Sequence, residues 1–305
     1  MPDIEDAGLC LDRAQHFRFG RGLSVTDFTA SEWCQQQVAF NLSAKLPKEV
    51  TETEAMAAGK KQHAELEAET AIEVEVETES REDVWALRLL ATIESLHQLK
   101  SSGLTREIFC FGLLQGCWVR GIVDQIELDA EGRAVVVEHK TRRNPSLPSP
   151  AQKRTARLQV LLYCALFGSL AASAQQYLPA MLQQLKLDGQ ACLGRGVVDY
   201  AESLGLVPVN TLQHVGNHLA SIASQAPPLA LTHHVRYLWQ GDGSELGQEH
   251  VKLDGFAVQQ ALRRHLLFWG GDKAPEVVPT TEDWKCRHCL FAAKCPTGQG
   301  VQHKA

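Results

Sequence analysis

The sequence predicts an α/β protein in which a helix, three antiparallel strands and a second helix form the core. Residues 81–100 place apolar side chains near the helical period, and residues 151–171 form a long, mostly apolar helix. Between them, residues 106–114, 117–128 and 133–140 are rich in branched and aromatic side chains, which is typical of strands. The 305 residues, 44% of them hydrophobic, predict one elaborated domain and exclude a disordered or collagenous protein.

Further elements are expected on the N-terminal side of this core. A short helix is predicted over residues 30–40, with Ser24 or Thr26 as its cap. Residues 53–70 form an Ala- and Glu-rich pattern that is typical of a helix. Residues 70–78 alternate apolar and acidic side chains strictly, and this alternation predicts a half-exposed strand.

The residues that follow the core are predicted to add helices, a hairpin and a cysteine-rich tail. Weaker helical patterns continue to about residue 223, and a hairpin with strands at 233–239 and 247–253 is expected around a Gly-Asp-Gly turn. A helix is predicted over residues 254–269. We divide the single domain into an N-terminal tail (1–23), a core with its N-terminal helix (24–171), helical and hairpin additions (172–270) and a cysteine-rich tail (271–305).

The N-terminal residues suggest a reducing compartment, and this affects how the cysteines are interpreted. The N-terminus is acidic, without the apolar run of a secretory signal or the Arg-rich composition of a transit peptide. We therefore expect a nuclear or cytoplasmic protein, with a mitochondrial location left open. The most apolar stretch, Leu158 to Ala174, is shorter than the roughly 20 residues of a membrane-spanning helix, so no membrane association is expected. Nine cysteines in a reducing compartment suggest metal ligands before disulfides.

Positive charge is concentrated in one segment of an otherwise acidic chain. The formal net charge is −6, yet residues 133–157 hold seven Arg or Lys side chains against Glu138 alone. This segment is compatible with a phosphate-binding surface and equally with a solvated helix face.

The central hairpin is predicted to bring two carboxylates and a lysine to one face of the sheet. A three-residue loop with Gly132 in the left-handed conformation places Asp124 directly opposite Glu138, with Cβ atoms about 5 Å apart. Lys140 points the same way, whereas His139 points away. Two carboxylates this close repel unless a cation lies between them, and oxygen ligands suit Mg²⁺ or Mn²⁺. The alternative, a surface salt-bridge cluster, is less favoured because apolar residues flank both strands.

Two helices carry further candidate residues at helical spacing. Gly59, His63 and Glu67 share one helix face, and His63 would complete a metal shell; the alternative is an ordinary solvent-facing or core histidine. Gln159 and Tyr163 also share a face of an otherwise apolar helix. They would orient the lysine or contact a nucleic acid, or else be buried side chains that the core satisfies.

The C-terminal cysteines form an incomplete metal-binding set. Cys286, Cys289 and Cys295 supply three thiolates, whereas structural zinc sites and iron–sulfur clusters both use four protein ligands. Cys34 and Cys10 are the candidates for the fourth. Spacing alone does not distinguish zinc from a cluster.

Four motifs occur in order along the chain: G-x₃-H-x₃-E at 59–67, G-x-x-D at 121–124, E-x-K at 138–140 and Q-x₃-Y at 159–163. Together with the cysteine tail they resemble the PD-(D/E)XK nucleases of the RecB and Cas4 type, and most closely the eukaryotic exonuclease V family. The resemblance runs from about residue 24 to residue 295. One departure is His139, where many relatives have a small or apolar residue; because its side chain should point away from the metals, we do not count it against activity.

The resemblance implies a restriction-endonuclease-like core, with a mixed sheet flanked by helices, and a Mg²⁺-dependent exonuclease that acts on single-stranded DNA in repair or genome maintenance. It implies that His63, Asp124 and Glu138 hold the metal and that Lys140 positions or activates the attacking water. It also implies a [4Fe–4S] cluster with a structural role, held by Cys34 and the three tail cysteines. The residues expected to support the site or contact DNA are Glu67, Arg142, Arg143, Lys153, Arg154, Gln159 and Tyr163. We expect a monomer, with a single-strand-binding protein as a candidate partner.

Two other functions stay open from the sequence. One is a structure-specific endonuclease with the same active site but different strand access. The other is a catalytically inert nucleic-acid-binding adaptor that carries a cluster or zinc, and the intact Asp124, Glu138 and Lys140 argue against it.

Overall fold

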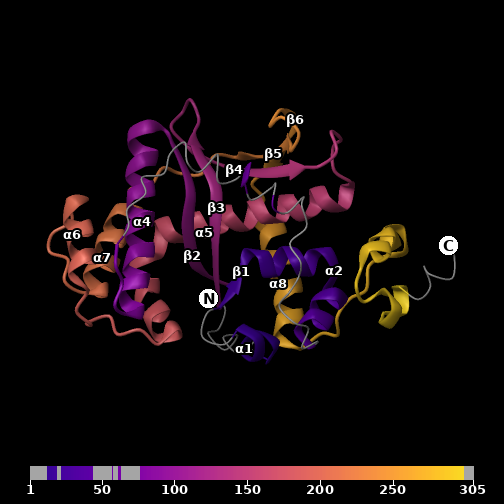
Figure 1. Cartoon of the computed structure of the whole chain (residues 1–305), viewed down its shortest axis with the longest axis horizontal. Coiled ribbons are helices and arrows are strands. Elements are labelled where there is room, and N and C mark those ends of the chain that lie inside the picture. Colours follow the sequence, from indigo (N-terminus) through magenta and orange to yellow (C-terminus); the bar gives the residue numbers. More distant parts are fainter. Residues whose placement is uncertain (1–11, 19–21, 44–56, 58–60, 63–75, 299–305) are drawn as a thin grey trace.

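The computed structural model describes residues 12–18, 22–43, 57, 61–62 and 76–298 of the chain (Figure 1). The strands are β1 (Leu23–Ser24), β2 (Leu104–Leu114), β3 (Cys117–Leu128), β4 (Ala134–Arg142), β5 (Thr232–Trp239) and β6 (Glu245–Lys252). The helices are α1 (Asp12–Arg18), α2 (Val25–Ser43), α4 (Arg81–Ser102), α5 (Pro150–Leu185), α6 (Arg195–Ser203), α7 (Leu212–Ala223) and α8 (Gly255–Gly270). Two short 3₁₀ helices, η2 (Thr280–His288) and η3 (Ala292–Lys294), lie in the C-terminal tail.

The strands form one six-stranded mixed sheet in which β3 is the organising strand. β2 pairs with one edge of β3 along its whole length, after a two-residue turn. The other edge is shared: β1 pairs in parallel at Val119 and Arg120, and β4 pairs antiparallel from Gln125 to Leu128. Residues 121–124 of β3 lie between these two pairings, past the end of β1 and past the last β3–β4 pair, Gln125–Val137. β5 extends the sheet in parallel beyond β4, and β6 closes it as an antiparallel edge strand.

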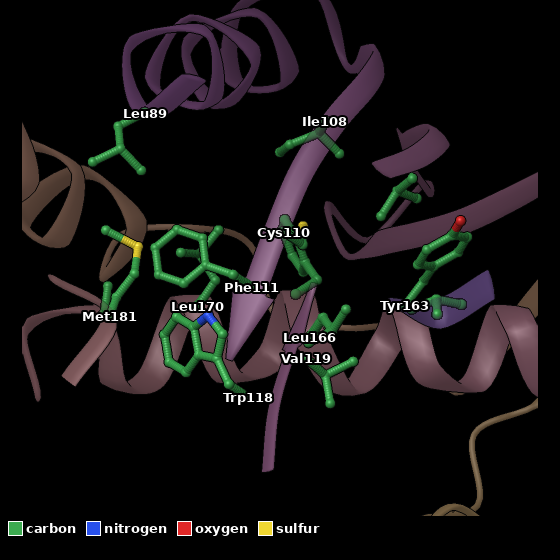
Figure 2. Packing of buried hydrophobic residues seen from close by; sticks show 14 of the residues in the cluster. Leu89, Ile108, Cys110, Phe111, Trp118, Val119, Tyr163, Leu166, Leu170 and Met181 are labelled. Carbon is green, nitrogen blue, oxygen red and sulfur yellow. The ribbon is translucent and has the colours of Figure 1, made fainter. Parts of the chain in front are cut away.

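Helix α5 is the long helix on which the sheet packs (Figure 1). It starts with a capping box between Ser149 and Gln152, which satisfies backbone N–H groups at its N-terminus. Figure 2 shows Val119 beside Leu166 of α5 and Phe111 beside Leu170, and all four residues are buried. By length and composition α5 could cross a membrane, but half of its most apolar window is buried inside the molecule, as in the core helix of a globular protein.

The predicted core elements are confirmed, and the differences have local causes. β3 has the predicted bounds, and Gln125 pairs with Val137 in the predicted hairpin register. α5 runs on to Leu185 beyond a non-helical Ser173, because a second helical segment follows without an intervening loop. α2 is also longer than predicted and begins next to its Ser24 cap.

The predictions for residues 53–78 fall mostly outside the described residues. Of the helix predicted over 53–70, residues 57 and 61–62 are described and are helical. Of the strand predicted over 70–78, the described part, 76–78, has no regular secondary structure, so the strand prediction is wrong there. Alternation gives a strand only where another strand pairs with it.

Candidate active site and four-cysteine pocket

The turn between β3 and β4 sets the geometry of the site. Gly132 adopts the left-handed conformation (φ 74°), which a three-residue hairpin loop requires. The backbone ladder then runs from Leu128–Ala134 to Gln125–Val137. One residue further, Asp124 Oδ2 accepts a hydrogen bond of 2.9 Å from the His139 N–H. Where the backbone ladder between β3 and β4 ends, the Asp124 side chain therefore takes the place of a backbone acceptor and keeps the two strands bonded.

The two predicted carboxylates lie together at this point. Asp124 and Glu138 come together at the end of the ladder, where the Asp124 carboxylate bonds the backbone of His139 directly after Glu138, and Glu138 is only 2% exposed. Burial raises the pKa of Asp124 to about 6, although the His139 N–H and the Lys140 charge oppose the rise. A divalent cation between the two carboxylates would offset their repulsion, and the donor set is the all-oxygen type that Mg²⁺ or Mn²⁺ prefers.

Lys140 connects this pair to helix α5. Its Nζ lies 2.6 Å from Glu138 Oε1 and donates a 2.8 Å hydrogen bond to Gln159 Oε1. Gln159 Nε2 in turn donates to the Tyr163 hydroxyl at 3.1 Å. Burial would lower the pKa of Lys140, but the charges of Glu138 and Asp124 outweigh it and raise that pKa. The lysine is therefore a fixed positive charge in the metal-free protein, oriented by the two α5 residues as one of the sequence interpretations expected.

Tyr163 fits against β3 because position 121 is a glycine. A Cβ at Gly121 would lie 2.7 Å from Tyr163 Cε1 and 2.9 Å from Val25 Cγ2. Figure 2 shows Tyr163 at one end of the packed cluster, with its hydroxyl oxygen directed away from the α5 ribbon. Burial and the nearby charges of Glu138 and Asp124 raise the pKa of Tyr163, so its hydroxyl stays protonated.

Sequence reasoning missed Glu107 on β2. The β2–β3 ladder pairs Arg106 with Gln125 and Ile108 with Val123, so Glu107 falls at the position across from Asp124. Its backbone takes a positive φ of 48°, which is uncommon for glutamate. Its charge contributes to the raised pKa of Asp124, which places a third carboxylate near the pair. The register of the β2–β3 turn was the signal that would have found it.

The basic residues after β4 differ in their surroundings. Arg142 donates to the Ser146 carbonyl and, at 3.3 Å, to Gln152 Oε1, so it braces the loop before α5. Arg143 is exposed and Lys153 is half-buried. Arg154 bonds two carboxylates, as described below, so phosphate contact by Arg154 would need those ion pairs to open.

The predicted ligands on the preceding helix, His63 and Glu67, lie outside the described residues, as does Gly59.

The four predicted cluster cysteines line one pocket, although Cys34 is far from the others in sequence. Helix α2 breaks at Cys34, whose backbone is extended (φ −168°, ψ 108°), and Cys34 Sγ accepts from the Gln37 N–H at 3.4 Å. Cys34 therefore caps the second half of α2. The pocket wall includes Cys286, Cys289 and Cys295 of the tail.

Electrostatics also place these thiols near one another. Burial raises the pKa of Cys34, and the charges of Cys289 and Cys295 add to the rise. Across the described residues, no group of three or more His, Cys, Asp or Glu side chains has metal-binding geometry. The thiols thus line the pocket without surrounding a common centre, and their chemistry fits a four-thiolate site. Cys10, the other candidate, lies outside the described residues.

Comparison with known proteins assigns the family. Residues 13–135 and 205–296 match the family model described as "Exonuclease V - a 5' deoxyribonuclease". A Danio rerio protein named "Exonuclease V" is 31% identical over 283 residues, which cover 92% of this chain and 71% of the relative. The chain belongs to the exonuclease V family. It is therefore an exonuclease-type hydrolase that acts on DNA.

The exonuclease V match includes part of each site. Asp124, Cys34 and the tail cysteines lie inside the matched residues, whereas Glu138 and Lys140 fall between the two matched segments. A solved structure titled "Crystal structure of SSO0001" is similar over 90% of this chain and 86% of that chain, with a TM-score of 0.37 and 14% identity, a level that carries no argument about the fold.

Proposed function

We propose that this exonuclease V family member is a Mg²⁺- or Mn²⁺-dependent nuclease that degrades single-stranded DNA from an end, with a PD-(D/E)XK core. The observation that carries the proposal is the convergence of Asp124, Glu138 and Lys140 on one hairpin, with Asp124 bonded to the His139 N–H and Lys140 Nζ 2.6 Å from Glu138 Oε1. Membership of a DNA exonuclease family supports the substrate class.

Each residue has a defined task in the proposed reaction. Asp124 and Glu138 would hold the metal, with His63 as a further ligand, and the bound metal would supply Lewis-acid activation of the phosphodiester. Lys140, oriented by Gln159, would place its positive charge beside the attacking water and the phosphate oxygens. Tyr163 fixes Gln159 and thereby the lysine.

We further propose that the four-cysteine pocket holds a [4Fe–4S] cluster with a structural role. The donor set of four thiols supports a cluster or zinc equally, so iron and zinc analysis of anaerobically purified protein distinguishes them.

The test uses end-labelled linear single strands, closed circular single strands and blunt duplexes, each with Mg²⁺ or with EDTA. We expect Mg²⁺-dependent loss of the linear single strand only. Rapid cutting of circles would identify an endonuclease, and binding without any metal-dependent cleavage would identify an adaptor. Asp124→Asn should bind linear strands without degrading them.

A further inference from the structure

A closed ring of charged groups joins the cysteine tail to α2 and α5. Arg154 of α5 contacts Glu32 at 2.8 Å and Glu282 of η2 at 2.9 Å. Lys285 pairs with Glu282 at 2.6 Å and donates a 3.0 Å hydrogen bond to the carbonyl oxygen of Trp33. Because Trp33 follows Glu32 in the chain, these contacts close on themselves; we call these five residues the charged ring.

Much of the charged ring is shielded from water, which separates it from ordinary surface ion pairs. The Lys285 side chain is 3% exposed and the Glu32 side chain 6% exposed. The Lys285 Nζ also lies 4.1 Å from the centre of the Trp33 ring. Buried charges persist only when they are paired, and breaking such a pair is strongly unfavourable. Lys285 and Glu32 are therefore held in one arrangement, whereas Arg154, whose side chain is 46% exposed, is the solvent-facing member of the ring.

Helix α8 fixes the ring from a third side. Arg264 and His265 both contact the Glu32 carboxylate. His265 Nδ1 lies 2.9 Å from the Ser31 hydroxyl and is fully buried. Four elements (α2, α5, α8 and η2) thus meet at Glu32 and its partners, and Figure 1 shows the tail beside α2 at one end of the molecule.

The ring members stand directly beside two of the four thiols. Cys34 follows Trp33, and Cys286 follows Lys285, so the Lys285–Trp33 hydrogen bond joins the two cysteine-bearing segments across 252 residues. A second contact, from the Glu276 N–H to Gln35 Oε1 at 3.0 Å, holds the same two segments together. None of these bonds uses a thiol or a metal.

We propose that the charged ring, with Lys285 as its positioning residue, docks the cysteine tail on α2 in the absence of metal and so presents Cys34 to the tail thiols. The proposal depends on the four-thiol site proposed above. Because α8 already contacts Glu32, the ring has only to order the segment between Gly270 and Lys285 before any metal binds, and the entropic cost of closing so short a loop is small. Metal binding then has only to draw together thiols that already share one pocket.

The test measures thiol exposure in metal-free, reduced protein. Iodoacetamide labelling is followed at each cysteine by mass spectrometry, with exposed Cys192 as the fast reference and buried Cys110 and Cys164 as reports of global unfolding. In the wild type, Cys34 should be labelled at least tenfold more slowly than Cys192. In Lys285→Met, labelling of Cys34 should rise at least fivefold, while Cys110 and Cys164 stay protected.

Two considerations show that faster labelling of Cys34 in Lys285→Met would report undocking of the tail. Removing a nearby cation would by itself reduce the thiolate fraction and slow labelling, so faster labelling reports undocking. Lys273→Met removes an exposed ion pair with Glu276 in the same tail and should change nothing. Lys285→Arg should restore protection.

Two results would overturn the proposal: wild-type Cys34 that is labelled as fast as Cys192, or Lys285→Met that matches the wild type. If Lys285→Met also exposes Cys110, that variant has lost its global fold, and Glu282→Gln replaces it in the test. Labelling of Cys34 in Glu282→Gln should then rise at least fivefold while Cys110 and Cys164 stay protected. The assay contains no DNA and no metal, so failure of the nuclease or cluster proposal would appear separately, in the cleavage and metal analyses.

Discussion

Gly121→Ala is expected to damage the active site indirectly, by displacing the side chain of Tyr163. The new Cβ would lie 2.7 Å from Tyr163 Cε1 and 2.9 Å from Val25 Cγ2, and both of these side chains are buried. Contacts this short force a shift of the ring. Overpacking of a core costs about 1–3 kcal/mol, and we expect the free energy of unfolding in urea to fall by that amount.

The same shift should reach the reacting groups. Tyr163 accepts from Gln159, which accepts from Lys140, so a displaced ring removes the support of the lysine. Misplacement by about 1 Å costs up to roughly a hundredfold in rate. We therefore expect the Mg²⁺-dependent cleavage rate on saturating linear single strands to fall about tenfold to a hundredfold.

Gly112→Ala is the matched control. Its Cβ would lie 2.5 Å from Ser169 Oγ, so it overpacks the same sheet against α5 but touches neither Tyr163 nor Gln159. It should lose similar stability and keep most of its cleavage rate. Gly121→Ala/Tyr163→Leu should regain stability without regaining rate. The reasoning is refuted if Gly121→Ala is as stable as the wild type, or if both glycine variants lose the same fraction of activity.

Three further predictions concern charge, protons and thiols. Asp124→Asn should abolish cleavage and leave metal-free stability unchanged or raised, because it removes one of two adjacent buried carboxylates; urea unfolding and the strand assay measure both, and a cleaving variant contradicts the metal assignment. Burial lowers the pKa of His233 to about 4, from about 6.5 in the unfolded chain. The unfolded chain therefore binds a proton at this residue at a higher pH than the folded protein does. The free energy of unfolding should be unaffected by His233 above pH 6.5 and should fall, by about 3 kcal/mol at most, as the pH is lowered from 6.5 to 4. His233→Asn, which keeps an acceptor for the Val136 N–H, should flatten that part of the stability–pH curve, and an unchanged slope would exclude His233 as the cause. Cys34→Ala should lose bound iron or zinc by elemental analysis while Cys192→Ala retains it; full metal content in Cys34→Ala would remove that residue from the site.

The part of the site that sequence could predict is the part that local rules determine. A glycine-containing turn of fixed length sets the β3–β4 register, and the register alone brings Asp124 and Glu138 together. The same kind of spacing rule linked Gln159 to Tyr163 on one helix face.

Spacing rules could not predict features that depend on residues far away in the sequence. Arg154 lies in the basic segment of the sequence and so resembles a phosphate-binding residue. In the structure its guanidinium instead forms ion pairs with carboxylates of α2 and η2. No periodicity marks the break of α2 at Cys34, because the segment that lies against it is at the other end of the chain.

The shared edge of β3 has a consequence for shortened forms of this chain. β1 is only two residues long, yet it covers the backbone of Val119 and Arg120 and leads directly into α2. A transcript or proteolytic product that begins after residue 43 would keep every residue of the catalytic hairpin. It would also expose backbone donors and acceptors on an apolar strand, and such an edge pairs readily with another chain. We expect such a product to self-associate, so its loss of activity in the cell would appear first as loss of soluble protein.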